Sequence, residues 1–292
     1  MDIKIKHIKS ESFEWERPGI WNGMHFYGPG RLHKVTISTD QGIEGIGWNG
    51  GTAAVRPNGF YGLYVDYYKS FLIGKNPLDT ENLTLNLGQK QDKILGSAGL
   101  HTQVLAALII ACWDIKGKVK GRSIHSLLGE EQKRVRAYVA GGYYAKNKGL
   151  KELQEELLHN VENLNATAIK IKIGDPNAGI SEDMKRVEAA RNAIGPNIDL
   201  LVDANCAFDL NTAIEYAKEM ENYDIYWFEE PLAIHDFKAH KTLNSSTSLM
   251  IAAGENYYTL ADFETLIENN GAGMLNVDAT ICPGYDLSLI HI

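Results

Sequence analysis

The second half of the chain alternates between short apolar runs and helix-compatible stretches. Six runs rich in apolar and β-branched residues occupy 134–142, 166–174, 198–205, 225–231, 249–256 and 273–279. The segments between them have the composition and length of helices, as at 180–195, 211–223 and 259–271. Nearly continuous apolar strands that alternate with helices are typical of a parallel sheet covered by helices. A repeat of about twenty-five residues, with no GxGxxG motif after the first strand, favours a (β/α) barrel over a dinucleotide-binding fold.

The first half has a different pattern. Apolar and polar residues alternate at 2–10, and 33–51 reads as two short strands around a turn, whereas 101–120 reads as a long buried helix. This pattern predicts a small α+β unit. The segment 16–31 is rich in glycine, proline and aromatic residues, which fits either a surface loop or a lid over a pocket.

Together these patterns predict two units in a chain of 292 residues. We assign an N-terminal α+β capping domain to 1–128 and strands one to six of a (β/α) barrel to 129–292. The predicted fold class is therefore α/β, an incomplete TIM-type barrel with a capping domain.

Composition narrows the functional classes. The net charge of -8 argues against a nucleic-acid-binding surface. The longest apolar run, Val104 to Trp113, is about half of the ~20 residues that span a bilayer, and the N-terminus lacks the apolar core of a signal peptide. Three cysteines without CxxC spacing suggest neither a disulfide framework nor a zinc site. We expect a cytoplasmic protein with no membrane or nucleic-acid partner.

Three carboxylates stand at the ends of successive predicted strands. Asp203, Glu229 and Glu255 recur at equal steps along the sequence, and all strand ends of a parallel barrel meet at one rim. One such residue is more often a solvated acid or a helix cap. Three together, without His or Cys, form an oxygen-ligand set suited to Mg²⁺, with Mn²⁺ as an alternative. The neighbour Glu230 would face the opposite side of an extended strand.

Two lysines share a face of the second predicted strand. Lys170 and Lys172 are two residues apart, so their Cα atoms lie about 6.5 Å apart on the same side. Close ammonium groups lower each other's pKa, and a nearby metal lowers it further, which would make one lysine a usable base near neutral pH. The alternative is a structural ion network that neutralises the carboxylates.

These residues lie within short motifs: AIKIKIG, VDAN, WFEEP, GEN and NVDA, preceded by IIACWDIKGKVKGRSIHSLLG. In this order and spacing they resemble the mandelate racemase branch of the enolase superfamily. The resemblance implies a magnesium ion held by Asp203, Glu229 and Glu255, and Lys172 as the base that removes the proton α to a substrate carboxylate. In this superfamily Mg²⁺ stabilises the ene-diolate that forms on deprotonation. Lys170 would be the electrostatic partner of that base.

The same resemblance implies functional roles for three other polar residues. Asn205 and Asn256 look like groups that contact the substrate or support the metal ligands. Asp278 would pair with a histidine on the next strand, about one βα unit further on, as the second acid/base. His291 is too close to Asp278 to occupy that strand.

The chain ends before that strand, so we expect a C-terminally truncated member that shows little turnover, although its full-length parent is an enzyme. Residues 287–292 read either as the start of the sixth barrel helix, with Asp286 as its cap, or as the translated end sequence of a transposase-made sequencing library. The second interpretation is the one we favour.

The favoured function is Mg²⁺-dependent dehydration of an acid sugar, an aldonate or aldarate, by analogy with this branch. Racemisation or epimerisation of a 2-hydroxy acid would use the same residues. A Schiff-base lyase and a noncatalytic ligand-binding barrel are alternatives from other classes. His25, His33 and Arg56 are candidate contacts to the polyol part of a small carboxylate substrate, and we expect the parent to be a homo-oligomer.

Overall fold

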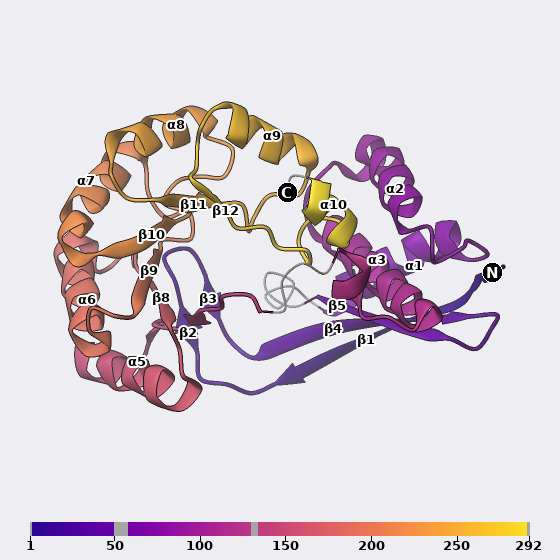
Figure 1. Cartoon of the computed structure of the whole chain (residues 1–292), viewed down its shortest axis with the longest axis horizontal. Coiled ribbons are helices and arrows are strands. Elements are labelled where there is room, and N and C mark those ends of the chain that lie inside the picture. The colour runs from indigo at the N-terminus through magenta and orange to yellow at the C-terminus, as the bar shows by residue number, and fades with distance from the viewer. Residues whose placement is uncertain (1, 50–57, 130–133, 291–292) are drawn as a thin grey trace.

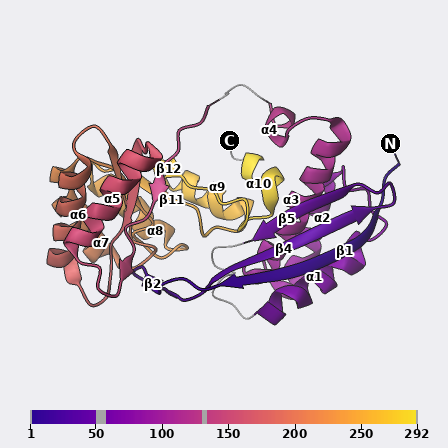
Figure 2. The ribbon, with the colours of Figure 1, turned by 90° about the horizontal axis from the view of Figure 1, so that it is seen from below.

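The N-terminal part of the molecule is an antiparallel sheet covered by helices (Figures 1 and 2). The computed structural model describes residues 2–49, 58–129 and 134–290. The sheet has the order β1-β4-β5 and consists of β1 (Ile5–Trp15), β4 (Gly30–Thr39) and β5 (Glu44–Asn49). The helices are α1 (Asn58–Leu72), α2 (Thr80–Leu95), α3 (Leu100–Lys120) and α4 (Ile124–Leu127). The predicted hairpin and the predicted long helix are both confirmed.

Helix α3 is the centre of this part, because apolar residues surround it. Val104, Leu108 and Ile109 are completely buried in one cluster with residues of the sheet and of α1. The strand β5 approaches α3 through Gly45 and Gly47. A Cβ atom at Gly47 would overlap the carbonyl oxygen of Ala107, so only glycine permits this distance between strand and helix.

The segment predicted to be a loop or a lid forms a hairpin. Its strands β2 (Ile20–Trp21) and β3 (Phe26–Tyr27) pair antiparallel, and β2 also pairs with β7 (Tyr144–Ala145), far away in the sequence. The indole nitrogen of Trp21 donates to the Asp175 carboxylate at 2.8 Å. The hairpin therefore belongs to the N-terminal part by sequence and is attached to the barrel part by its contacts.

The remaining described residues form a curved parallel sheet inside an arc of helices (Figure 1). Its order is β12-β11-β10-β9-β8-β6, and all the neighbouring pairs are parallel. The strands are β6 (Val139–Ala140), β8 (Ala168–Lys172), β9 (Asp199–Asp203), β10 (Ile225–Glu229), β11 (Ile251–Ala253) and β12 (Met274–Leu275). The helices are α5 (Leu150–Leu164), α6 (Gly179–Ile194), α7 (Leu210–Met220), the short 3₁₀ turn η2 (Glu221–Tyr223), α8 (Phe237–Ser246) and α9 (Leu260–Glu268).

All six predicted strands are confirmed, each inside its predicted range. The domain boundary between 128 and 129 stays a prediction, since residues 130–133 lie outside the described ranges.

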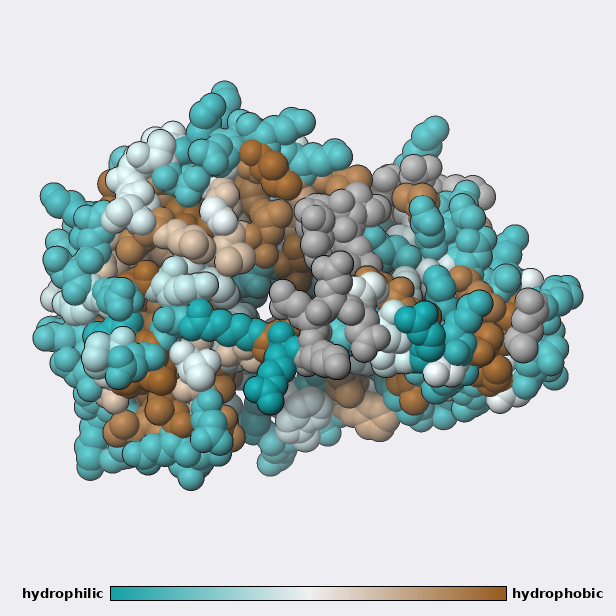
Figure 3. Space-filling model, in the orientation of Figure 1, coloured by the Kyte–Doolittle hydropathy of each residue, from teal (hydrophilic) through white to brown (hydrophobic). Residues whose placement is uncertain are grey.

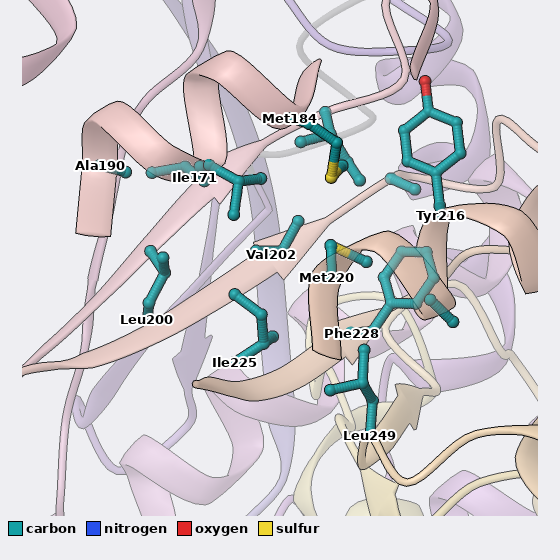
Figure 4. Packing of buried hydrophobic residues seen from close by; sticks show 14 of the residues in the cluster. Ile171, Met184, Ala190, Leu200, Val202, Tyr216, Met220, Ile225, Phe228 and Leu249 are labelled. Carbon is teal, nitrogen blue, oxygen red and sulfur yellow. The ribbon is translucent and has the colours of Figure 1, made fainter. Parts of the chain in front are cut away.

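Side-chain alternation divides the β8 residues between two faces. Ile169, Ile171 and Ile173 are completely buried in the core between the sheet and helices, where Ile171 lies near Val202 and Met184 (Figure 4). The lysines between them point to the opposite face, the inside of the curved sheet. The isoleucines therefore pack outward against the helices.

The last described helix, α10 (Gly284–Ile290), packs against the N-terminal helices. Asp286 lies in its first turn and accepts hydrogen bonds from Trp113 Nε1 at 2.8 Å and Thr80 Oγ1 at 3.0 Å. The residue therefore joins α10 to α2 and α3. The alternative interpretation of this segment as a helix agrees with α10, but Asp286 is not its cap, because the helix begins two residues earlier.

Hydrophilic residues dominate the outline of the molecule, with apolar patches between them (Figure 3). Among the described residues, no helix has both the length and the apolar character that a membrane-spanning segment requires.

The close approach of β5 to α3 yields a stability prediction. We expect Gly47→Ala to lower the free energy of unfolding by about 3 kcal/mol, because the added methyl group overlaps backbone atoms that cannot move independently. Gly62→Ala in α1 is the control. Its Cβ meets no atom within 4 Å, so helix propensity should make it neutral or stabilising by up to about 1 kcal/mol. Urea unfolding followed by circular dichroism measures both, and equal effects would contradict the steric argument.

Candidate metal centre and active site

The strand register brings the three predicted carboxylates together. In the parallel ladder Asp203 at the end of β9 is the partner of Glu229 at the end of β10, and Glu255 follows β11 by two residues. One ligand oxygen from each lies within 4.8 Å of the others. The cluster is therefore compact enough for one cation to contact all three side chains.

Burial gives these carboxylates unusual electrostatics. Asp203 and Glu229 are completely buried, and Glu255 is partly exposed. Burial, followed by repulsion from Asp203, raises the pKa of Glu229 to about 7 and the pKa of Glu255 to about 7. A hard cation stabilises the ionised form of these carboxylates, which burial and mutual repulsion otherwise disfavour. The donor set fits a divalent metal ion.

Both lysines of β8 contact the cluster. Lys170 Nζ donates to Glu229 Oε1 at 2.6 Å and lies 3.5 Å from Asp203 Oδ2, whereas Lys172 Nζ donates to Asp203 Oδ2. Burial lowers the pKa of each lysine, but the carboxylates, Asp203 foremost, raise it more, so the net shift is upward. Repulsion from Lys170 lowers the pKa of Lys172, as predicted, but attraction by the carboxylates exceeds this repulsion, so the protein's own groups move the pKa away from neutrality.

Aromatic side chains frame the lysines. Tyr138 lies on the barrel side, with its hydroxyl 3.3 Å from Lys170 Nζ. The ammonium of Lys172 lies 5.1 Å from the ring centroid of Tyr143, a distance suited to a cation–π contact. Tyr143 in turn meets Tyr27 of the hairpin edge to face, at 6.0 Å between ring centroids. Both parts of the molecule thus surround the lysines.

The two predicted asparagines support the carboxylates. Asn205 Nδ2 donates to Glu255 Oε1 at 3.2 Å, and its backbone N–H donates to Asp203 Oδ1 at 2.8 Å. Asn256 Nδ2 donates to Glu230 Oε2 at 2.6 Å. Glu230 is also buried: the strand ends at Glu229, and a positive φ of 40° at Glu230 breaks the alternation that would have turned it to the other face.

Asp278 faces the same pocket. This cavity of about 600 Å³ is lined by Lys170, Lys172, Glu255 and Asp278, among other residues. One Asp278 oxygen accepts hydrogen bonds from the backbone and hydroxyl of Thr280, both at 2.7 Å. The turn after β12 therefore fixes the orientation of this carboxylate.

The three candidate polyol contacts lie in different places. His25 lines a neighbouring cavity of about 320 Å³, which shares Asn205 and Asn256 with the first. His33 is not among the lining residues of either cavity: it is completely buried in the N-terminal core, with Nδ1 2.7 Å from Ser12 Oγ and its ring stacked on Tyr61. Substrate contact by His33 is therefore not supported. Arg56 lies outside the described residues.

Several site residues escaped the sequence reasoning. Trp227 Nε1 donates to Glu229 Oε2 at 2.8 Å, and Asn276 Nδ2 donates to Glu229 Oε1 at 2.8 Å. Trp227 precedes Glu229 by two residues on the same strand, so alternation alone could have placed it on the inner face. No sequence signal marks Tyr27 or Tyr143, since their positions depend on the pairing of distant segments.

The raised pKa values predict how pH affects cation binding. Without a cation, protonated Glu229 and Glu255 favour folding, a contribution that is complete below about pH 4.5 and is lost as pH rises through about 7. A cation requires both groups ionised, so we expect the increase in Tm caused by excess MgCl₂ to be larger at about pH 8 than at about pH 6. Thermal unfolding followed by circular dichroism measures this difference.

Two variants control the pH experiment. Glu255→Gln removes a ligand and should decrease the Mg²⁺-induced rise in Tm at both pH values. Glu188→Gln removes an exposed acid from α6 and should leave the rise unchanged. A rise in Tm of equal size at both pH values in the unmodified chain would contradict proton competition.

Comparison with known proteins agrees with this geometry. The family model "Enolase C-terminal domain-like" matches residues 152–289, and "Mandelate racemase / muconate lactonizing enzyme, N-terminal domain" matches residues 19–129. L-talarate/galactarate dehydratase of Salmonella typhimurium is 31% identical over 245 residues, which cover 83% of this chain and 59% of that protein. D-galactarolactone cycloisomerase of Agrobacterium fabrum is 31% identical over 258 residues, which cover 86% of this chain and 64% of that protein.

A solved structure shares the fold over nearly all of this chain. The 3,6-anhydro-D-galactonate cycloisomerase from Zobellia galactanivorans superposes with a TM-score of 0.82 and 28% identity, covering 96% of this chain and 74% of that one. The chain spans less than two thirds of the length of the two curated relatives. With both family models matched in order and the fold shared, the chain belongs to the mandelate racemase/muconate lactonizing enzyme family of the enolase superfamily.

Proposed function

We propose that the protein removes the proton α to the carboxylate of an acid sugar in a Mg²⁺-dependent reaction and dehydrates that sugar. One observation carries the proposal: Glu255 of the carboxylate cluster lines one pocket of suitable size together with Lys170 and Lys172, which bond the other two carboxylates. Mn²⁺ shares the preference for oxygen ligands and is an alternative metal. The dehydratase among the relatives supports the choice of reaction.

The charges of the cluster are consistent with this chemistry. When all three carboxylates are ionised they outnumber the two ammonium groups by one, so the protein's own groups then leave an excess negative charge in a buried place. A bound divalent cation would make the net charge of the carboxylates and lysines positive. The carboxylate of a substrate would then bring this net charge to zero. A buried site of this composition thus favours the joint presence of a cation and an anionic ligand.

The protein's side chains would divide the remaining tasks. Lys172 is the proposed base, because its ammonium contacts Asp203 and faces the open pocket. Lys170 contacts Glu229 and Tyr138, which suits an electrostatic role. When bound, Mg²⁺ would supply positive charge that offsets the negative charge developing on the substrate and lowers the pKa of Lys172. Asp278 is held by Thr280 and is available to orient a second acid/base group.

Abstraction of the α-proton can be tested separately from dehydration. We expect the chain to incorporate deuterium from D₂O at the α-carbon of an aldarate such as galactarate, in the presence of MgCl₂, as measured by proton NMR. Exchange needs only the base and the cation. Lys172→Ala should decrease the exchange rate by at least about 100-fold, the usual contribution of a general base. Removal of Mg²⁺ with a chelator should do the same.

Lys185→Ala is the matched control. Lys185 lies on the exposed face of α6, where it pairs with Glu182, so this variant should exchange at the unmodified rate. Formation of a 2-keto-3-deoxy acid identifies dehydration, whereas a change of configuration without loss of water identifies epimerisation. Covalent trapping of substrate by borohydride together with resistance to chelation would instead support a Schiff-base lyase and refute the proposal.

A further inference from the structure

The pocket contains a cation that comes from the N-terminal part of the chain. Arg17 follows β1 by two residues and lines the same cavity of about 600 Å³ as Lys170, Lys172 and Asp278. It is half-buried. Glu255 of the carboxylate cluster and this guanidinium therefore face one space, although Glu255 follows a barrel strand and Arg17 belongs to the segment that enters the hairpin.

The Arg17 side chain is held in place by the hairpin. Its Nε donates to the carbonyl oxygen of Gly28 at 2.8 Å, and its guanidinium carbon lies 5.9 Å from the centroid of the Tyr27 ring. These contacts use one nitrogen and one face of the group. The terminal nitrogens of the guanidinium fork make no hydrogen bond to any described residue, so they are available to a ligand.

The charge of Arg17 differs from that of the other cations in the pocket. Lys170 and Lys172 are paired with the cluster, and Arg31 forms an ion pair with Glu14 at 2.6 Å. Within the described ranges 2–49, 58–129 and 134–290, Arg17 forms no ion pair. A positive charge without a counterion, facing a pocket for an anionic substrate, indicates a second anionic group on that substrate.

We propose that Arg17 binds the distal carboxylate of a dicarboxylic acid sugar and so makes the site selective for aldarates over aldonates. This inference rests on the proposed function, which places the other carboxylate of the same molecule at the cluster. A planar guanidinium fork matches a carboxylate in two parallel hydrogen bonds, which adds orientation as well as energy. A terminal CH₂OH at the same place would leave the charge uncompensated.

The test compares two ligands that differ only at the distal carbon. Galactarate carries a carboxylate there and galactonate a CH₂OH group, and isothermal titration in excess MgCl₂ gives both Kd values. We expect galactarate to bind at least about tenfold more tightly, the range of a charge-assisted hydrogen bond. Arg17→Gln can still donate to the Gly28 carbonyl. This variant should raise the Kd of galactarate to about that of galactonate and leave the Kd of galactonate unchanged.

Further variants separate charge from structure. Arg17→Lys keeps the charge without the fork and should restore part of the preference. Arg122→Gln is the control, because Arg122 also bonds a backbone carbonyl, that of Ser126, but does not line the pocket. Thermal unfolding of each variant establishes that it is folded.

Three outcomes overturn the inference. The first is an equal loss of affinity for both acids in Arg17→Gln, and the second is no preference for galactarate in the unmodified chain. The third is tighter, Arg17-dependent binding of 6-phosphogluconate, which would assign the distal group as a phosphate. If neither acid binds in a Mg²⁺-dependent manner, the proposed function itself fails and this inference fails with it.

Discussion

The site depends on the burial of like charges at the ends of adjacent parallel strands. The ladder places Lys172 beside Asp203, and Asp203 beside Glu229, so two anions share one rim with the ammonium group that partly neutralises them. Buried charges are tolerated only when partners surround them. Hydrogen bonds from Trp227 and Asn276 to the two oxygens of Glu229 supply part of that support. The excess of negative charge that remains when all three carboxylates are ionised suits the cluster to a cation.

Much of this arrangement could be predicted because parallel barrels follow simple geometric rules. Apolar runs bounded by helical segments located all six strands, and the position of Asp203, Glu229 and Glu255 at strand ends was enough to place them at one rim. The period of two likewise put Lys170 and Lys172 on the inner face. These inferences needed only local periodicity and the fact that parallel strands end on the same side.

Other features could not be predicted because they depend on irregular backbone or distant pairing. The sequence position of a histidine on a strand does not show whether its side chain points into the core or into a pocket. The His33 ring packs against Tyr61, away from the pocket. Glu230 is buried because the strand stops one residue earlier. Tyr27 reaches the site only because Ile20 of its hairpin pairs with Ala145, a contact between segments that the sequence pattern does not connect.

Hydrogen bonds attach the hairpin to the barrel part of the molecule without involving the metal-binding carboxylates. Trp21 of the hairpin donates a hydrogen bond to the Asp175 carboxylate, in the loop between β8 and α6. The hydroxyl of Tyr144, on the strand that pairs with the hairpin, donates to buried Asp183 of α6. These bonds attach the hairpin to α6 and to the loop before it. The hairpin in turn orients Arg17. Because none of these contacts involves the three carboxylates at the strand ends, a substitution in the hairpin can change which distal group is accepted while the charge of the cluster stays the same. The proposed selectivity and the proposed proton transfer would therefore have separate physical origins in one pocket.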